Sequence, residues 1–309
     1  MPLTTNTPKP MLKIAGAPVT EHQIVKAREA GISEIVLATS YLADVFEPHF
    51  GDGSRFGLKI KYAYEDEPLG TGGAIINAAQ HLEISDSDSI FIFNGDVLSA
   101  HDLLAQSDLH SNSGAQVTLH LVEVEDARAY GCVPISQQGQ VLDFLEKLEK
   151  PIANTINAGC YIFSSKTLSE IPLGVVSSVE REIFPSLLRK GETIFGYLDR
   201  GYWIDMGTPQ SMIRASRDLI LKPSISKATP VVIDGTVTLG EVSVDESSQV
   251  GGGSYLEDGV RIDGGSVVMG SIIGEKTHVE HGVLIENSYI APGSRVISGS
   301  NIRGEIFGF

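Results

Sequence analysis

Basic residues and cysteine are both scarce in this sequence, and each shortage narrows the classes of function that it can serve. The 309 residues include 23 lysines and arginines against 39 aspartates and glutamates, which gives a formal net charge of −16. Nucleic acids and anionic membranes attract proteins through basic surfaces, so we expect neither as a partner. Small anionic substrates are still compatible with this charge, because a few lysines and a metal ion can supply positive charge locally.

Long apolar runs and closely spaced cysteines are also missing. No apolar run reaches the roughly 18 residues of a membrane-spanning helix, and the first residues do not form a signal peptide. Cys132 and Cys160 lie far apart without C-x-x-C spacing, which favours buried free thiols over a disulfide. We therefore expect a cytoplasmic protein.

A glycine-rich segment stands at the centre of the first half of the chain. Residues 58–64 alternate between apolar and polar side chains as a strand does, and residues 74–82 have a helical pattern. Pro68 and then glycines separate the two. Glycines before a helix let the backbone approach a ligand closely, and the free N–H groups there attract phosphate or base oxygens. An ordinary strand-to-helix turn is the alternative interpretation.

A second strand pattern leads into a carboxylate. Residues 89–93 are apolar apart from the first, and they run into Asn94, Gly95 and Asp96. In open α/β sheets ligands bind at the carboxyl ends of the strands. Asp96 is therefore well placed to hold a metal ion beside phosphates.

The order of the surrounding elements predicts an α/β domain with a doubly wound, Rossmann-like sheet over residues 1–221. Its alternating elements are a helix over 18–30, a strand over 34–40, a short helix over 42–50 and the strand over 58–64. Later elements are strands over 116–124, 129–136, 140–144 and 156–163, and an amphipathic helix over 178–190. In the strand order 3-2-1-4 the first strand lies in the centre of the sheet, and no segment ahead of the first helix can form it. We therefore expect two unpaired strand edges.

The last part of the chain follows a different pattern. Apolar residues recur every six positions, with a one-residue slip before Ile273 and another before Ile290, at Val244, Val250, Leu256, Ile262, Val268, Ile273, Val279, Ile285, Ile290, Val296 and Ile302. Small residues follow many of these four positions later, at Ser248, Ser254, Ser266, Thr277, Ser294 and Ser300. This period predicts a left-handed parallel β-helix over 231–309, joined to the first domain by a linker over 222–230. The last coil lacks a clear polar cap, so we expect homo-oligomers that form through the β-helix.

Taken in order, these motifs resemble those of the sugar-1-phosphate nucleotidylyltransferases, most closely the bacterial mannose-1-phosphate guanylyltransferases. The resemblance covers nearly the whole chain. Its motifs are Pro2-Leu3-Thr4, Thr7-Pro8-Lys9-Pro10-Met11, Glu67-Pro68-Leu69-Gly70-Thr71, Asn94-Gly95-Asp96, Phe144-Leu145-Glu146-Lys147, Asn157-Ala158-Gly159, Trp203-Ile204-Asp205-Met206-Gly207 and the hexapeptide tail.

The resemblance implies a nucleotidylyl transfer. In such enzymes an oxygen of the sugar 1-phosphate attacks the α-phosphorus of a nucleoside triphosphate, and pyrophosphate leaves. The protein positions the reactants and neutralises charge rather than forming covalent intermediates. GTP and mannose 1-phosphate are the implied substrates, and glucose 1-phosphate with dTTP or UTP is the alternative.

The resemblance also implies which residues bind metal and nucleotide. Asp96 and Asp205 match the family's Mg²⁺ ligands, with a helix N-cap before Gly207 as the alternative for Asp205. Lys9 resembles the lysine that contacts the triphosphate and is expected to be catalytic with the two aspartates. The nucleotide-binding positions are Lys9, Pro68, Leu69, Gly70, Thr71 and Gly95.

Four further matches concern the sugar phosphate. Lys147 resembles the catalytic lysine that neutralises it, and Glu146 the residue that hydrogen-bonds the sugar hydroxyls. Asn157 and Gly159 resemble sugar-pocket residues, and Glu180 is a weaker match. The alternatives are a solvated charge run, the plain start of a strand, and for Glu180 a carboxylate near a helix N-terminus.

The doubled Glu-Lys sequence leaves its register open. Glu149-Lys150 is followed by the proline that often accompanies this motif, whereas Glu146-Lys147 is preceded by Phe144-Leu145 as in the family. We take Glu146-Lys147 as the matching pair.

The chain departs from the family at its beginning. A first strand and a G-x-G-T-R loop that wraps the triphosphate should lie just before Pro2, and they are not in this sequence. We expect that the sequence starts at an internal methionine, because Asp96, Asp205, Lys147 and Asn157 are all in place. A non-catalytic, sugar-nucleotide-binding regulatory subunit is the alternative, and for the chain as written we expect crippled catalysis.

An acyltransferase is a third interpretation, because such enzymes also contain hexapeptide repeats. They usually need a catalytic histidine between coils and more uninterrupted coils than this tail offers.

Overall fold

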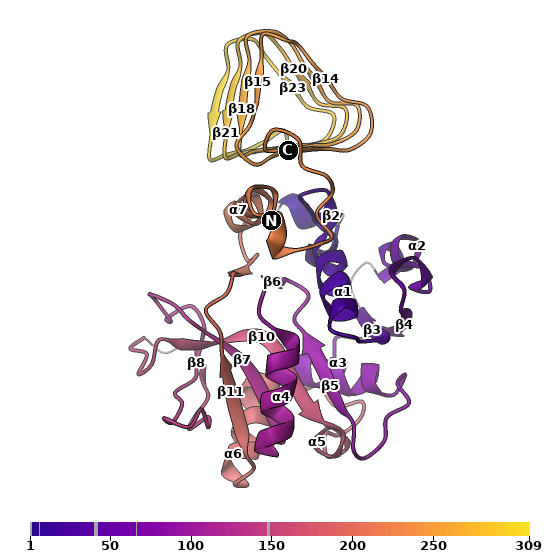
Figure 1. Cartoon of the computed structure of the whole chain (residues 1–309), viewed down its shortest axis with the longest axis vertical. Coiled ribbons are helices and arrows are strands. Elements are labelled where there is room, and N and C mark those ends of the chain that lie inside the picture. The colour runs from indigo at the N-terminus through magenta and orange to yellow at the C-terminus, as the bar shows by residue number, and fades with distance from the viewer. Residues whose placement is uncertain (1, 6, 40–42, 66, 147–148) are drawn as a thin grey trace. The chain divides into compact units, whose positions relative to one another are not determined.

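The computed structural model describes residues 2–5, 7–39, 43–65, 67–146 and 149–309 (Figure 1). They form two compact units, one made of Ala27–Trp203 and the other of Met1–Lys26 together with Ile204–Phe309. The domain boundaries expected from the sequence, at 222–230, stay a prediction.

The main sheet of the unit Ala27–Trp203 has six strands, with β10 (Thr155–Ser164) in its centre. Antiparallel partners of β10 are β7 (Val117–Glu123) along one edge and β5 (Ser89–Phe93) along the other. The sheet continues through β11 (Ile194–Leu198), which is parallel to β7, and through the short strands β8 (Gly131–Cys132) and β9 (Leu145–Glu146). The strands predicted over 116–124 and 156–163 are confirmed. In place of the strands predicted over 129–136 and 140–144, the structure has the two-residue strand β8 and two isolated bridges, one between Ile135 and Val141 and one between Gln140 and Phe195.

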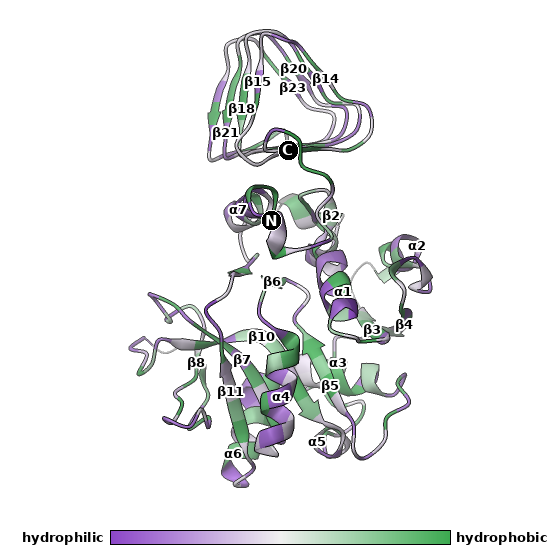
Figure 2. Ribbon diagram, viewed as in Figure 1, coloured by the Kyte–Doolittle hydropathy of each residue, from purple (hydrophilic) through white to green (hydrophobic). Residues whose placement is uncertain are grey.

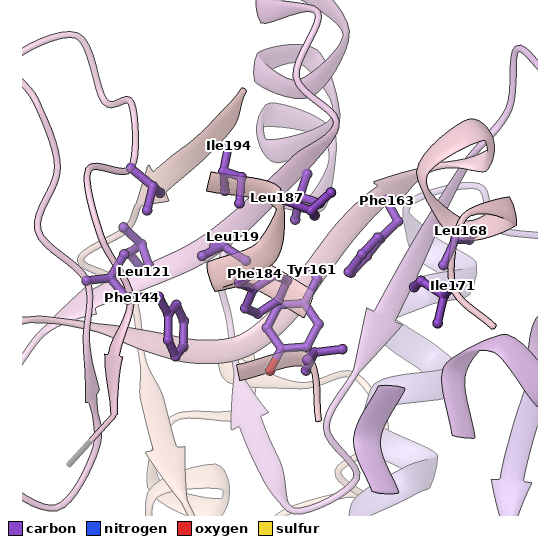
Figure 3. Close-up of a cluster of buried hydrophobic side chains, with 14 of the residues drawn as sticks. Leu119, Leu121, Phe144, Tyr161, Phe163, Leu168, Ile171, Phe184, Leu187 and Ile194 are labelled. Carbon is purple, nitrogen blue, oxygen red and sulfur yellow. The ribbon is translucent and has the colours of Figure 1, made fainter. Parts of the chain in front are cut away.

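The core of this unit lies against the main sheet. Nearly every residue of β7 and β10 is buried, which is the pattern of strands covered on both faces. Most of these side chains are apolar, and Thr118, His120 and Thr155 are buried polar exceptions. Phe184 lies at the centre of the cluster in Figure 3, with ring centroids 5.3 Å from those of Phe144 and Tyr161 and 5.9 Å from that of Phe163. Aromatic rings at these separations add specific contacts to the burial of apolar area.

Helices pack against both sheets of this unit. The helices are α2 (Glu47–Phe50), α3 (Gly70–Ala79), α4 (Leu103–Ser113), α5 (Ser165–Ser169), a π-helical turn (Val179–Ile183) and α6 (Phe184–Arg189), with 3₁₀ turns at Ala43–Val45 and Ser54–Phe56. α4 packs on β7 and β11, and in Figure 2 it carries both purple and green residues, whereas the sheet strands behind it are mainly green. Asp102 caps α4, since its carboxylate accepts the N–H groups of Leu104 and Ala105. Among the residues that the structure describes, the helices are too short or too polar to serve as a membrane span.

The strand order predicted two strands with an unpaired edge, and the structure has one of them in a second, two-stranded sheet and the other in the main sheet. Strand β3 (Glu34–Thr39) pairs in parallel with β4 (Lys59–Tyr64), and α3 packs against both. Within the described residues β3 pairs only with β4, and β5 pairs only with β10. Both strands have apolar runs typical of a sheet centre, yet most of their residues are only half-buried. The two unpaired edges expected from the strand order are therefore observed.

The other unit begins with a small hairpin and one long helix. Strands β1 (Lys13–Ile14) and β2 (Ala17–Pro18) are joined by Ala15 and Gly16, both with positive φ, as a two-residue hairpin turn requires. Helix α1 (Val19–Glu29) follows, which confirms the helix predicted over 18–30. The unit also contains 3₁₀ turns at Pro2–Thr4, Lys9–Met11 and Pro223–Ile225, and helix α7 (Pro209–Leu221).

The C-terminal strands stack as a parallel β-helix of three sheets, as the six-residue period predicts (Figure 1). The first sheet has β13 (Thr236–Thr238), β16 (Ser254–Leu256), β19 (Ile272–Ile273), β22 (Tyr289–Ile290) and β25 (Ile306–Phe307). The second has β14 (Ser243–Val244), β17 (Arg261–Ile262), β20 (His278–Val279) and β23 (Arg295–Val296). The third has β15 (Gln249–Gly251), β18 (Val267–Met269), β21 (Leu284–Glu286) and β24 (Asn301–Arg303).

The repeat pattern has a direct structural cause. The periodic apolar residues from Leu256 to Ile302 form one continuous core, against which the partly buried Val250 packs. The prediction is wrong for Val244, which is 39% exposed because its strand β14 is the end strand of its sheet. Some of the small residues bond through their hydroxyls to carbonyls of the next coil, as Ser266 does to Glu280 O at 2.8 Å and Thr277 to Ala291 O at 3.2 Å. The predicted slip before Ile273 corresponds to a coil that is one residue shorter, since Val237 aligns with Tyr255 and Tyr255 with Ile272.

Candidate active site

The predicted metal carboxylate Asp96 lies in a turn between β5 and the short strand β6 (Val97–Ser99). The turn closes with a hydrogen bond of 3.2 Å from Val97 N–H to Asn94 C=O. It follows the carboxyl end of β5, where the sequence placed it, and Asp96 is half-buried. The hydrogen-bonded turn therefore holds the backbone of this half-buried carboxylate at the strand end.

Gly159 in β10 anchors this turn. Its carbonyl accepts the N–H of Asn94 at 2.8 Å. A bulge follows Asn157 in the pairing of β10 with β7, and Gly159 has a φ of +77° there. A Cβ at this position would lie 3.0 Å from Val97 Cγ2 and 3.1 Å from Asn94 Cβ. A side chain at this position would therefore crowd the turn that carries Asp96, and the positive φ also favours glycine here.

The amide of Asn157 is held at both ends. Its Oδ1 accepts the N–H of Gly159 at 3.2 Å, and its Nδ2 donates to the hydroxyl of Tyr161 at 2.9 Å. Tyr161 is fully buried, and burial raises the pKa of its hydroxyl, so the proton stays in place. That proton points to the carboxylate of Glu180, with 3.4 Å between Tyr161 OH and Glu180 Oε1.

The carboxylate of Glu180 accepts hydrogen bonds from side-chain hydroxyls of three different elements. Thr71 Oγ1 donates to Oε2 at 3.0 Å and Ser178 Oγ donates to the same oxygen at 2.9 Å, in addition to the contact from Tyr161. Ser178 is the N-cap of the π-helical turn that contains Glu180. The structure thus joins Thr71 and Asn157, which the sequence assigned to different ligands, through Glu180 and Tyr161.

The glycine-rich segment is the first turn of α3 rather than a loop ahead of it. Gly70 has a φ of +70°, and a Cβ there would lie 2.5 Å from Ser177 O. At Gly72 a Cβ would lie 2.5 Å from Ser177 Oγ, and at Gly73 it would lie 2.7 Å from Val175 O. The space beside these glycines is filled by the chain itself, so their small size serves this packing.

Two other predicted nucleotide-binding positions lie just before that turn. Pro68 is exposed and Leu69 is half-buried. Leu69 N–H donates to Glu65 Oε2 at 3.1 Å, and Leu69 C=O accepts the N–H of Ser177 at 3.0 Å. These bonds fix the backbone of Leu69 relative to the start of α3.

The predicted sugar-phosphate motif lies at the end of the main sheet. Glu146 belongs to β9, and its backbone pairs with Gly131 in β8. β8 in turn pairs with β10 at Ile156, next to Asn157. The register therefore places Glu146 two strands from the predicted sugar-pocket strand, and Lys147 lies outside the described residues.

Lys9, in the other unit, begins a 3₁₀ turn between two prolines. Its carbonyl accepts Leu12 N–H at 3.1 Å, and Lys9 is half-buried. Pro10 C=O accepts the hydroxyl of Thr20 at 3.1 Å, which attaches the turn to α1. Fixed φ angles at the prolines and these bonds hold the backbone on either side of Lys9.

Asp205 ends the strand β12 (Trp203–Asp205) just before α7. The N-cap of α7 is Thr208, which forms a capping box with Ser211, so Asp205 does not fill the cap role that was the alternative for it. Asp205 is half-buried, and a Cβ on Gly207 would lie 3.2 Å from its Oδ2. Glycine at position 207 therefore leaves room beside this carboxylate.

The chemistry of Asp96 and Asp205 fits a magnesium ion. Both are half-buried carboxylates, and Mg²⁺ is bound in many enzymes by one or two carboxylates together with substrate phosphates. A dedicated cluster of three or more His, Cys, Asp or Glu ligands is not found among the described residues. Each carboxylate by itself, Asp96 in one unit and Asp205 in the other, thus suits an ion that arrives with a phosphate ligand.

Comparisons with known proteins identify the family. The model of the nucleotidyl transferase family matches residues 1–221, more than half of the chain. The chain belongs to the nucleotidyl transferase family. It is 44% identical over 285 residues to a mannose-1-phosphate guanylyltransferase of Mycobacterium tuberculosis, with 86% of this chain and 79% of the relative covered. A mannose-1-phosphate guanylyltransferase catalytic subunit beta of Drosophila melanogaster is 32% identical, with 82% and 68% covered.

A solved structure agrees with the fold. HddC from Yersinia pseudotuberculosis has a TM-score of 0.60 and 28% identity to this nucleotidyltransferase, over 70% of this chain and 93% of HddC. The family and these relatives establish the chain as an α/β nucleotidyltransferase of the class that acts on sugar phosphates, a class that generally uses a divalent metal.

Sequence reasoning missed Tyr161 and gave Glu180 little weight. Tyr161 reads as one more apolar residue of a buried strand, and Glu180 as an ordinary carboxylate near a helix start. Their spacing in the sequence carries no sign that they meet, because β10 and the π-helical turn are separate elements. The bulge at Asn157 and Gly159, announced by an Asn-x-Gly inside an apolar run, was the available signal.

Proposed function

We propose that this nucleotidyltransferase transfers a guanylyl group from GTP to mannose 1-phosphate, forming GDP-mannose and pyrophosphate. The observation that carries the proposal is the fit of the Asp96 turn against Gly159, whose N–H bonds to the side chain of Asn157. It puts a predicted metal ligand next to predicted sugar-phosphate residues within one unit. The names of the relatives from Mycobacterium tuberculosis and Drosophila melanogaster support guanine and mannose.

In this proposal Asp96 and Asp205 hold Mg²⁺, whose charge would stabilise the phosphates during the displacement. Lys9 contacts the triphosphate, and Lys147 neutralises the sugar phosphate. The start of α3 at Gly70 supplies backbone contacts to the nucleotide, together with the other predicted nucleotide-binding positions Pro68, Leu69, Thr71 and Gly95. Glu146, Asn157 and Gly159 orient the sugar, so that positioning and charge neutralisation carry the reaction.

The proposal extends to assembly and location. Homo-oligomers form through the β-helix, whose last strand and C-terminal residue include the half-buried Phe307 and the exposed Phe309. Cys132 and Cys160 are buried free thiols, which supports a reducing, cytoplasmic setting. The nucleotidyltransferase domain covers 1–221, the linker 222–230 and the β-helix domain 231–309.

The test is a panel of four nucleoside triphosphates against mannose 1-phosphate and glucose 1-phosphate, with release of pyrophosphate and the NDP-sugar both measured. We expect GTP with mannose 1-phosphate to give the highest kcat/KM. Asp96→Asn and Asp205→Asn should each lower turnover and the dependence on Mg²⁺. Asp126→Asn is the matched control, because that exposed carboxylate pairs with Arg128.

Two results would contradict this assignment. Faster reaction of glucose 1-phosphate with dTTP or UTP would show that these, and not mannose 1-phosphate and GTP, are the substrates. Nucleotide binding without any product from any pair would support the regulatory subunit instead.

A further inference from the structure

Two segments that are distant in the sequence, the start of α3 and the chain around Ser177, are joined by backbone hydrogen bonds. Ser177 N–H donates to Leu69 C=O at 3.0 Å, and Gly72 N–H donates to Ser177 C=O at 2.9 Å. The glycine positions of the α3 turn leave no space between the segments, as the short Cβ distances to Ser177 show. A displacement of the α3 turn therefore has to displace Ser177 and the residues that follow it.

The side chain of Thr71 adds a directed link between the segments. Its Oγ1 accepts the N–H of Val179 at 3.0 Å and donates its own proton to Glu180 Oε2 at 3.0 Å. Val179 is fully buried, so this end of the link is fixed in the core. Thr71 itself is exposed, and water competes with its bonds until a ligand covers it.

The link continues from Glu180 to the bulge in β10. Tyr161 donates to the second carboxylate oxygen of Glu180, and Asn157 donates to Tyr161. The Thr71 hydroxyl accepts one hydrogen bond and donates one. The Tyr161 hydroxyl donates to Glu180 and bonds to the side chains of both Asn157 and Asn94. Such chains polarise one another, and the loss of one member weakens the others.

We propose that Thr71 is a positioning residue that couples the nucleotide half-site at the start of α3 to the sugar-phosphate half-site at Asn157, through Glu180 and Tyr161. This inference rests on the proposed function, because it takes the two ligands from it. Ordering of the α3 turn by the nucleotide holds Glu180, and through Tyr161 it holds the amide of Asn157. By thermodynamic reciprocity the sugar phosphate then strengthens nucleotide binding by the same factor.

The test compares four single variants of the full chain. Thr71→Val removes the hydroxyl and keeps the branched shape, whereas Thr71→Ser keeps the hydroxyl. Tyr161→Phe breaks the relay at its other end. Tyr255→Phe is its matched control, because Tyr255 is also fully buried and donates to a glutamate, Glu257, at 3.1 Å in the β-helix unit.

Affinity for mannose 1-phosphate is measured by calorimetry with and without the saturating magnesium complex of α,β-methylene-GTP, a GTP analogue that cannot release pyrophosphate, and affinity for this analogue is measured with and without mannose 1-phosphate. We expect Thr71→Val and Tyr161→Phe each to reduce the mutual enhancement by about tenfold, the factor that one lost hydrogen bond of ordinary net strength produces. Thr71→Ser and Tyr255→Phe should keep the enhancement of the parent. Unchanged enhancement in Thr71→Val and Tyr161→Phe would overturn the inference.

Hydrogen–deuterium exchange without ligand separates this inference from the proposed function. Thr71→Val should speed exchange of the Val179 amide, which loses its acceptor, while β10 and β7 keep the exchange of the parent. If the parent binds neither ligand, the proposed function fails. The exchange rate of the Val179 amide in Thr71→Val still tests whether the Thr71 side chain links the two segments. Exchange at Val179 that is equal in Thr71→Val and the parent would refute the link.

Discussion

Replacing Gly159 by alanine measures how strongly β10 determines the position of the Asp96 turn. The new Cβ meets two separate penalties. A φ of +77° in the left-handed region costs a non-glycine residue about 1–2 kcal/mol. Crowding against Val97 at 3.0 Å and Asn94 at 3.1 Å adds about 1–3 kcal/mol, because the neighbouring atoms belong to a hydrogen-bonded turn. We expect the free energy of unfolding to fall by about 2–5 kcal/mol in total.

Gly191 provides a matched control for the backbone penalty. It has the same φ of +77° in the same unit, and a Cβ added there would have no atom within 4 Å. Urea denaturation of Gly159→Ala and Gly191→Ala gives two losses of stability, and their difference isolates the contact with the turn. Titration with Mg-GTP should show weaker binding in Gly159→Ala alone, because only that change displaces Asp96. Equal destabilisation and equal binding in the two variants would refute the reasoning.

Three further outcomes are expected. Burial lowers the pKa of His22 below 6.5, so the unfolded chain binds a proton that the folded chain does not. Stability should therefore fall as the pH drops below 6.5, and thermal melts of His22→Gln should lose that part of the pH dependence. Phe184→Ala should cost about 3–5 kcal/mol in chemical denaturation, since a fully buried ring leaves a cavity, whereas Leu104→Ala at an exposed position should change stability by less than about 0.5 kcal/mol. Ala38→Lys places a charge at an exposed position of the half-paired strand β3, and it should slow self-association in light scattering; aggregation at the parental rate would argue against an exposed edge.

Local patterns were sufficient for several elements and for the position of one carboxylate. The six-residue period predicted the β-helix because each inward position must be apolar and each corner must be small. Every coil therefore repeats the same pattern of residue types. Helix α1 and strands β7 and β10 followed from ordinary periodicity. Asp96 was placed at a strand end by the apolar run before it, since a turn has to follow where that run stops.

Other features depend on which distant segments come into contact, and the local sequence pattern does not indicate such contacts. The glycines at the start of α3 looked like space for a ligand, but Ser177 and Val175 occupy the space beside them. Thr208, and not Asp205, is the N-cap of α7.

The sequence by itself determined the α/β class, the β-helix and the position of Asp96 at a strand end, because these follow from residue type and spacing within one element. Only the tertiary structure decided that Thr71, Glu180, Tyr161 and Asn157 share one hydrogen-bonded chain. Hydrogen bonds require atoms to approach within about 3 Å at suitable angles, and that approach is set by the packing of α3, β10 and the π-helical turn.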